Sequence, residues 1–371
     1  MIIVVSRKKF LLFLVGIVFL IAILLLIYGI WGSSIVETFN PGDDEVDLII
    51  KDYFDLRNNA LIEGDIDTVA SLYDRSHRYG VWAYEHEKKK LKYIEKWTAK
   101  QGVKMYDVKS LIKVTSKKKR ENGYRVNFTA STEYWYYYNN QFQKRNMFRI
   151  GTYHSIDIKK VDGVWKISRE WYTDPFADSL HINGMKSDEI TEYILSQNKS
   201  DYKVTNERRL KAMEYADRYC GAASDEEYGM KYNKKYKNYN PLGGDCANFA
   251  SQILYEGGKF RMTGSWKYGR GATKAWVNAQ GFKNYMLYSG RASKIAYGSY
   301  EKVLKASYKL LPGDFIAYEK NGKVTHISVV SGADSRGYAY VHSHNTDRYK
   351  VPWDLGWSNK GIKFWLVRVH Y

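Results

Sequence analysis

The longest apolar segment of the chain covers residues 10–31, where no side chain carries a charge. A helix rises about 1.5 Å per residue, so this segment can cross a hydrocarbon core of roughly 30 Å. Basic residues precede it and acidic residues follow, which by the positive-inside rule places residues 1–9 in the cytoplasm. The apolar region of a cleaved signal peptide is typically shorter, about 7 to 15 residues. The pattern therefore predicts a retained, single-pass signal-anchor in the cell membrane, with residues 32–44 as a tether outside it.

After the tether the apolar spacing is helical and then changes to the period of strands. Residues 46–65 and 77–102 place apolar side chains at helical intervals. Four segments rich in Val, Ile, Thr, Tyr and Trp follow, with turn residues between them. These segments are residues 106–117, 123–138, 147–161 and 164–174. Helices followed by a curved antiparallel sheet predict an α+β domain over residues 45–176.

The layout of residues 45–176, together with the motif VDGVWKISREW at 161–171, resembles the cone-shaped nuclear transport factor 2-like group. Members of that group serve as enzymes, binding pockets and spacers, so this resemblance implies a fold and no particular function. The segment contains no paired acid and base, and we interpret His154 as a packed or surface histidine. We expect a spacer, or a module that binds a partner protein of the envelope.

Residues 177–203 lose the strand period and are expected to connect to a last domain over residues 204–371. That domain contains the segment NPLGGDCANFASQILYEGG at 240–258, a glycine turn followed by a helix. Asp245 is the expected N-cap, which places Cys246 in the first helical turn. Free N–H groups and the helix dipole at that position stabilise a thiolate and lower its pKa. A small buried residue at a helix start would give the same local pattern.

Histidines follow on two predicted strands. His326 opens a strand ahead of the apolar sequence ISVV, and the next strand carries the sequence HSHNTD. On that second strand His342 and His344 share one face, while Asn345 belongs to the other. A base on a strand that faces a helix start suits a cysteine nucleophile, and a third polar residue would fix the tautomer of the base.

In order along the chain, the motifs GGDCANFASQ, SWKYGRGATKAWVN, LPGDFIAY, THISVVSG and HSHNTDR resemble the amidase domain of bacterial surface proteins. That family is akin to the NlpC-type and CHAP cell-wall hydrolases of the papain-like group. The resemblance covers most of residues 204–371 and implies a papain-like α+β fold, in which a helix packs on an antiparallel sheet. It also implies that Cys246 is the nucleophile and His326 the base.

The other roles in the expected site are less closely defined. Three candidates remain for the residue that orients the base, namely His342, His344 and Asn345, and we rank the last two above the first. The backbone N–H of Cys246 and a donor from the preceding turn would hold the oxyanion, with Asp245 and Asn240 as the neighbouring polar residues. Three aromatic residues either line a substrate cleft or pack in the core, namely Trp266, Tyr268 and Trp276.

Composition narrows the function classes. The formal net charge of +18 suits anionic neighbours, although a lysine-rich solvated surface would give the same count. The basic run at 116–123 lies at a predicted hairpin turn and lacks interleaved aromatic residues, so we do not expect nucleic acid as a partner. A disulfide between Cys220 and Cys246 would remove the nucleophile, but Cys220 fits helix packing instead. The HSHNTD sequence has no second metal motif beside it, and we expect no metal and no cofactor.

The sequence thus predicts a membrane-anchored, extracytoplasmic cysteine amidohydrolase or peptidase that acts by thioester acyl transfer. Amide bonds of cell-wall peptides in peptidoglycan are the expected substrate beside such an anchor. The alternative is a non-catalytic envelope protein that keeps a papain-like domain for binding or scaffolding.

Overall fold

The structure is a computed structural model that describes residues 41–176, 188–198, 206–269, 271–357 and 361–371. The predicted signal-anchor at 10–31 lies outside these residues. Within the described ranges, no helix is both long enough and apolar enough to cross a membrane.

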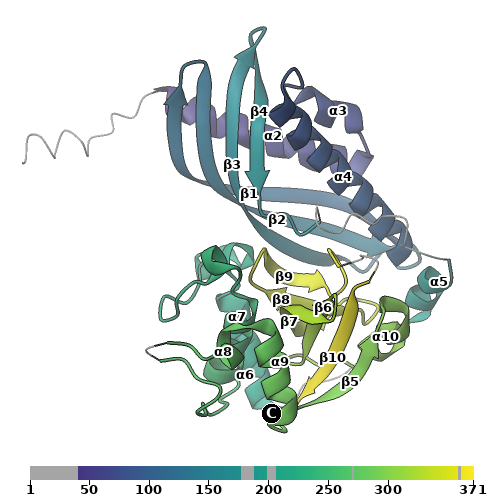
Figure 1. The fold of residues 1–371 in the computed structure, drawn as a ribbon. Coiled ribbons are helices and arrows are strands. Elements are labelled where there is room, and N and C mark those ends of the chain that lie inside the picture. Colours follow the sequence, from purple (N-terminus) through teal and green to yellow (C-terminus); the bar gives the residue numbers. More distant parts are fainter. Residues whose placement is uncertain (1–40, 177–187, 199–205, 270, 358–360) are drawn as a thin grey trace, which may run out of the picture. The chain divides into compact units, whose positions relative to one another are not determined.

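The first part of the described chain is helical and then becomes an antiparallel sheet, as predicted. Its helices are α2 (Pro41–Glu63), α3 (Ile66–Ser71) and α4 (Arg78–Gln101). Its strands are β1 (Val103–Arg120), β2 (Gly123–Tyr138), β3 (Asn146–Val161) and β4 (Val164–Tyr172). Helix α4 ends at Gly102, whose φ of 67° is left-handed and suits glycine. It packs against β4 and β1 and covers one face of the sheet (Figure 1).

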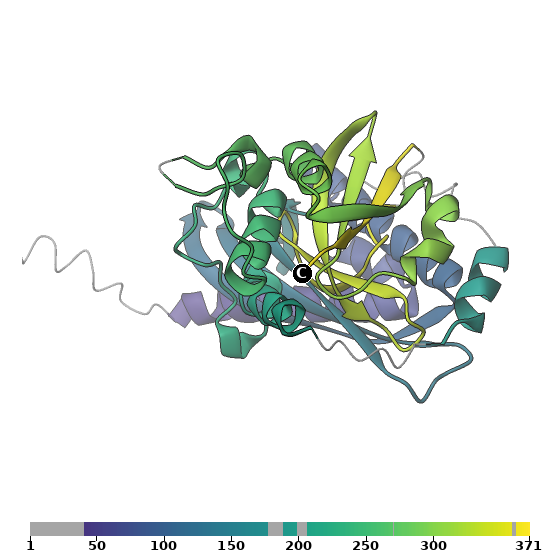
Figure 2. The ribbon, with the colours of Figure 1, turned by 90° about the horizontal axis from the view of Figure 1, so that it is seen from below.

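The second part begins with helices and ends with strands. Its helices are α5 (Asp188–Ser196), α6 (Glu207–Arg218), α7 (Cys246–Gln252), α8 (Lys274–Val277), α9 (Ala279–Tyr288) and α10 (Tyr300–Ser307). Its strands are β5 (Ala292–Gly298), β6 (Phe315–Lys320), β7 (Lys323–Ala333), β8 (Ala339–Ser343), β9 (Asp347–Pro352) and β10 (Lys363–Val369). Helices α7 and α9 both pack against β7 (Figures 1 and 2). The predicted α+β class is therefore confirmed for both parts.

One sheet runs through both parts of the chain. Its strand order is β1-β2-β3-β9-β8-β7-β6-β10-β5, and β4 pairs with β3 beside this path. The junction is an antiparallel pairing of β3 with β9, in which Ile150 lies opposite Arg348. Residues Ile50–Tyr371 accordingly form one compact unit. The boundary that we predicted at residues 177–203 thus separates strands that share a sheet.

Two clusters of buried side chains lie on the two faces of the C-terminal strands. On β6, Phe315 and Ala317 belong to one cluster, whereas Ile316 and Tyr318 belong to the other. This alternation follows from the period of two in a strand. We call the first the α7-side cluster, because Cys246 and Phe249 belong to it, and the second the α4-side cluster. The face on which a strand residue lies therefore decides whether it can reach Cys246.

Candidate active site

Cys246 is the first residue of α7 and is almost fully buried, with 6% of its surface exposed. Burial raises the pKa of its thiol to about 11, although the backbone N–H groups of Ile327 and Ala247 favour the thiolate. The sequence predicted a lowered pKa from the helix start. In the structure the cost of removing the charged form from water exceeds the effect of these N–H groups. Cys246 therefore rests as a neutral thiol at neutral pH.

Asp245 occupies the N-cap position of α7, as predicted, but its carboxylate does not bond the backbone of the first helical turn. One oxygen, Oδ1, accepts hydrogen bonds from the Tyr239 N–H at 2.9 Å and from Asn248 Nδ2 at 2.8 Å. The other, Oδ2, lies 2.6 Å from Nδ1 of His344. Asp245 thus ties the turn, the helix and the histidine together.

His344 lies directly after β8 and is fixed on all sides. Its ring stacks on Phe249 of α7, with ring centroids 3.8 Å apart and an angle of 7° between the planes. Its Nε2 lies 2.8 Å from the carbonyl oxygen of Tyr219, while Nδ1 faces Asp245. Both ring nitrogens therefore contact oxygen atoms that accept hydrogen bonds. The structure brings this histidine against the helix that begins with Cys246.

Asn345 is also brought to the start of α7. Its side-chain oxygen accepts a hydrogen bond from the backbone N–H of Asp245. Gly244 makes this approach possible, because a Cβ there would lie 2.1 Å from Nδ2 of Asn345. The φ of Gly244, +139°, also lies in a region that residues with a side chain rarely adopt. Position 244 thus requires glycine for two reasons, namely the close approach of Asn345 and the backbone conformation.

His326 is located away from this group. It lies opposite Tyr318 on β6, and its ring is 5.0 Å from that of Trp357 and 5.5 Å from that of Tyr318. Burial and the nearby Arg348 hold the pKa of the imidazole well below its usual value. The next residue, Ile327, belongs to the α7-side cluster. Because side chains alternate along a strand, the His326 ring faces the other side of the sheet and is not brought to Cys246.

His342 shares the α7 side with His344. It lies opposite Val329 of β7, a member of the α7-side cluster, and directly opposed residues lie on the same face. Its Nε2 is 3.1 Å from Oδ1 of Asp217 on α6, and its ring packs edge-on against Tyr349. The contact with Asp217 turns His342 toward α6, while His344 is turned toward Asp245 at the start of α7.

Asn240, the expected second oxyanion donor, lies in the turn ahead of Cys246. Its Nδ2 donates a hydrogen bond to the Tyr232 hydroxyl at 2.9 Å. The Tyr232 ring in turn lies 4.2 Å from the His344 ring, measured between centroids. Asn240 is therefore connected to the same group of residues, and its role in holding an oxyanion stays a prediction.

The aromatic residues predicted as either cleft or core side chains mostly belong to the core. Trp266 and Trp276 are fully buried and donate hydrogen bonds to α7, to Ser251 Oγ and Asn248 Oδ1, both at 2.9 Å. They support α7 through these hydrogen bonds, and they cannot line a cleft because neither residue is exposed. Tyr268 is partly exposed and accepts a hydrogen bond from the Lys237 N–H at 2.8 Å.

Cys220 and Cys246 are both free thiols in the structure. Cys220 is fully buried, and its Sγ donates a hydrogen bond to the carbonyl oxygen of Arg348 at 2.6 Å. Burial holds the pKa of this thiol well above its usual value. Cys220 therefore has the packing role that its sequence context suggested.

A cavity of about 1150 Å³ opens beside the turn that precedes Cys246. On one side it is lined by Gly243, Gly244 and Asn345. On the other side it is lined by residues of α4, of β4 and of the segment that follows β4, among them Trp82, His86, Trp171 and Asp174. This second wall was not predicted from the sequence. The tryptophans were visible in the sequence, but only the tertiary arrangement puts them opposite the GGDC turn.

The chain is 27% identical over 234 residues to the uncharacterized protein YjcM of Bacillus subtilis (strain 168). That match covers 58% of this chain and 50% of the relative, so the chain spans about half the length of YjcM. A solved structure, the intermembrane space region of the chloroplast protein ARC6, covers 35% of this chain and 94% of that chain. Its sequence identity is 13% and its TM-score is 0.27, which supports no conclusion about the fold.

The remaining comparison concerns the part of the chain that contains the candidate site. The candidate site residues all lie between α6 and β10, namely Asp245, Cys246, His326, His342 and His344. Residues 206–367 match the family described as "Putative amidase domain", which indicates an amidase-type hydrolase of amide bonds.

Proposed function

We propose that the protein is a cysteine amidohydrolase whose nucleophile is Cys246. The observation that carries this proposal is the grouping at the start of α7. The thiol of Cys246 lies at the backbone N–H groups of Ile327 and Ala247, and the adjacent Asp245 holds His344. A thiol at donors that can stabilise negative charge, with an oriented imidazole in the same group, suits acyl transfer.

The raised pKa of Cys246 makes a base necessary in this mechanism. A thiol with a pKa of about 11 is almost entirely protonated at pH 7, so its proton must leave as Sγ attacks the carbonyl carbon. His344 is the base that we propose, with Asp245 orienting the ring through Nδ1. Its Nε2 must first leave the Tyr219 carbonyl and lose its proton. Catalytic hydrogen bonds often form only in the complex with substrate.

The reaction then follows in two balanced steps. Sγ of Cys246 forms a bond to the carbonyl carbon, and its proton passes to His344 and on to the nitrogen of the leaving amine. The C–N bond breaks and a thioester remains. Water attacks the thioester, giving the carboxylic acid and restoring the thiol. The N–H of Cys246 and Nδ2 of Asn240 are the proposed donors to the oxyanion.

His326 remains the alternative base, since the family resemblance implies it. We favour His344 because it contacts α7, whereas the His326 ring packs against Trp357 on the other face. His326 could serve Cys246 only if β7 turned its other face toward α7.

For the substrate and location we propose the amide bonds of peptidoglycan peptides, cleaved outside the cell membrane. The support is the apolar segment at 10–31, together with the net charge of +18, which favours association with anionic wall polymers. We thereby assign to the whole protein the amidase activity that is indicated for residues 206–367.

A non-catalytic envelope protein is the second candidate, and two observations favour it. The pKa of Cys246 is raised, and both ring nitrogens of His344 already contact oxygen atoms. A site with a neutral thiol and an occupied histidine can bind a peptide without cleaving it.

The deciding experiment uses the full chain and purified peptidoglycan, with release of free amines and muropeptides as the readout. We expect Cys246→Ala to lower the release at least about a thousandfold, as for removal of other acyl-transfer nucleophiles. Cys220→Ser is the matched control, because serine can still donate to the Arg348 carbonyl, and it should retain activity. Equal release by the wild type and Cys246→Ala would reject the cysteine mechanism. No release by the wild type would favour the binding protein.

A further inference from the structure

The wall of the cavity opposite the GGDC turn has a composition of its own. Helix α4 contributes Trp82, Glu85, His86 and Lys89 to it. Their spacing of three and four residues places them on one face of the helix. An aromatic ring, an acid and two basic side chains are thus presented together to the cavity.

Strand β4 and its neighbour add further aromatic rings. Trp171 lies opposite Ser155 of β3, and directly opposed residues share a face. Tyr153 lies two residues before Ser155, so it faces the same side of the sheet as Trp171. Both line the cavity. The Tyr153 hydroxyl donates a hydrogen bond to Asp347 of β9 at 3.0 Å, which fixes this ring next to the C-terminal part.

The two indoles in this wall are unusually exposed. Trp82 and Trp171 each have 61% of their surface accessible to solvent. Large exposed aromatic side chains that gather around one concavity commonly mark a binding site, whereas single exposed ones need no explanation. The cavity volume of about 1150 Å³ also exceeds the space that one amide group requires.

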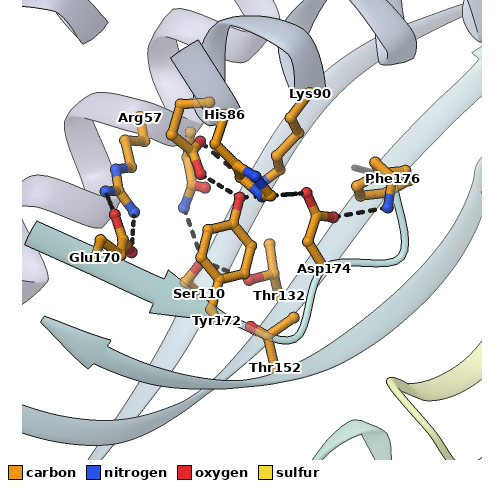
Figure 3. A network of polar contacts seen from close by, with 12 residues as sticks. Arg57, His86, Lys90, Ser110, Thr132, Thr152, Glu170, Tyr172, Asp174 and Phe176 are labelled. Carbon is orange, nitrogen blue, oxygen red and sulfur yellow. Dashed lines mark hydrogen bonds and ion pairs between the residues drawn. The ribbon is translucent and has the colours of Figure 1, made fainter. Parts of the chain in front are cut away.

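A network of polar contacts holds this wall in place (Figure 3). His86 is paired with Asp174 at 2.8 Å, and the backbone N–H of Phe176 donates to the same carboxylate at 2.7 Å. Glu170, which also lines the cavity, forms an ion pair with Arg57 (Figure 3). The segments before and after Trp171 are therefore anchored, and the wall is preorganised before a ligand arrives.

From these observations we propose that Trp82 and Trp171 bind the sugar rings of a cell-wall glycopeptide whose amide bond lies at Cys246. This inference rests on the proposed amidohydrolase function and adds the part of the substrate that the GGDC turn does not contact. A pyranose ring has apolar C–H faces and hydroxyl groups around its edge. Exposed indoles match the faces, while Glu85 and Lys89 on the same wall can exchange hydrogen bonds with the hydroxyls.

The continuity of the cavity is what joins the two parts of the ligand. Gly243, Gly244 and Asn345 line the same space as the two tryptophans. One ligand can therefore lie against the indoles and also reach the turn ahead of Cys246. A peptide alone would have its main chain at that turn and would not need both indoles.

The test measures binding in a Cys246→Ala background, so that no turnover interferes. The two probes are a soluble disaccharide-peptide from peptidoglycan and the same peptide without sugar, titrated by calorimetry into the full chain. We expect Trp82→Ala and Trp171→Ala each to weaken binding of the disaccharide-peptide about five- to tenfold, and the sugar-free peptide less than twofold. Trp→Phe at either position should retain most of the affinity, because a ring face remains.

Tyr288→Ala is the matched control, since Tyr288 is 88% exposed at the end of α9 and does not line the cavity. It should change neither affinity. Equal weakening of both probes by the tryptophan variants would show that the wall binds peptide and would overturn the proposal. So would unchanged affinities, or no binding of either probe. Hydrolysis of the sugar-free peptide by the wild type tests the proposed activity separately, so its failure is distinguishable from failure of the sugar site.

Discussion

His344 directly follows β8 and His326 lies on the neighbouring strand β7, yet their rings lie in opposite surroundings. On the α7 side, the His344 ring stacks on Phe249 and is paired with Asp245 at the start of the helix. On the other side, the His326 ring lies among Tyr318 and Trp357, and within the described chain its Nε2 has no hydrogen-bond partner. One histidine is held by a carboxylate and the other is surrounded by aromatic rings.

This difference has a simple origin in the strand period. Ile327, directly after His326, packs in the α7-side cluster, so its backbone N–H and not the His326 ring is presented to Cys246. A change of one residue in the position of β7 would exchange the two faces. The order of cysteine and histidine along the chain is therefore compatible with either His326 or His344 as the base. Substitutions can separate them.

The largest expected effect separates the two histidines directly. We expect His344→Ala to lower amide hydrolysis at least about a hundredfold, because the thiol of Cys246 then has no acceptor for its proton. His326→Ala should change the rate per folded molecule less than about threefold. It should instead reduce stability by about 1 to 3 kcal/mol, since a buried ring is replaced by a cavity.

The measurement compares initial rates of amine release with unfolding midpoints for the same protein samples. Asp245→Asn serves as the companion variant, because it keeps the shape of the side chain and removes the charge at Nδ1 of His344. A hundredfold loss in His326→Ala, with His344→Ala near the wild type, would restore the base that the family resemblance implies. It would also mean that β7 turns its other face toward α7.

Local patterns in the sequence predicted most of the fold. The helices and strands of residues 45–176 were predicted because their apolar spacing and turn residues are strong local signals. The start of α7 at Cys246 was predicted for the same reason, since a glycine turn and Asp245 precede a helical apolar pattern. The pairing of β3 with β9, which joins the two parts, has no local signal and was not predicted.

The site was predicted less completely, because its properties depend on burial and on which face a side chain takes. The pKa of Cys246 was expected to be low from the helix start, but desolvation dominates once α7 is packed. In the sequence, Trp266 and Trp276 cannot be distinguished from aromatic residues that line a cleft. Only their packing shows that they support α7. The cavity wall with Trp82 comes from a part of the chain far away in sequence and could not be assigned to the site beforehand.

A smaller effect concerns the pKa of the Cys246 thiol on the α7 side. Because its pKa is raised to about 11, the thiolate fraction should grow about tenfold per pH unit between pH 8 and pH 10. The rate of alkylation of Cys246 by iodoacetamide should follow this increase. Cys220 is fully buried, and burial holds the pKa of its thiol well above the usual value, so it should remain unmodified in the folded protein.

Mass spectrometry of tryptic peptides assigns the modified cysteine at each pH. A plateau of the Cys246 rate at or below pH 9 would contradict the burial seen here. It would favour instead the low pKa expected from the helix start alone. Alkylation of Cys220 at a comparable rate would mean that the α7-side cluster opens on the timescale of the reaction.

The smallest expected effect compares two adjacent glycines. Gly243 and Gly244 both have positive φ, +105° and +139°, so alanine at either position strains the backbone by about 1 kcal/mol or more. A Cβ at Gly243 meets nothing within 4 Å, whereas at Gly244 it would lie 2.1 Å from Nδ2 of Asn345. Gly244→Ala must therefore displace Asn345 from the Asp245 N–H, and Gly243→Ala need not.

We expect Gly244→Ala to lower kcat/KM about tenfold beyond the change caused by Gly243→Ala, with similar losses of stability in the two variants. Rates are compared at a temperature well below both unfolding midpoints. Adding Asn345→Ala removes the side chain that the new methyl group meets. If the steric account is correct, Gly244→Ala and Asn345→Ala together should be no less active than Asn345→Ala alone, apart from the strain shared with Gly243→Ala. Equal rates for Gly243→Ala and Gly244→Ala would mean that Asn345 does not act in the site, and would leave His344 and Asp245 as its organising pair on the α7 side.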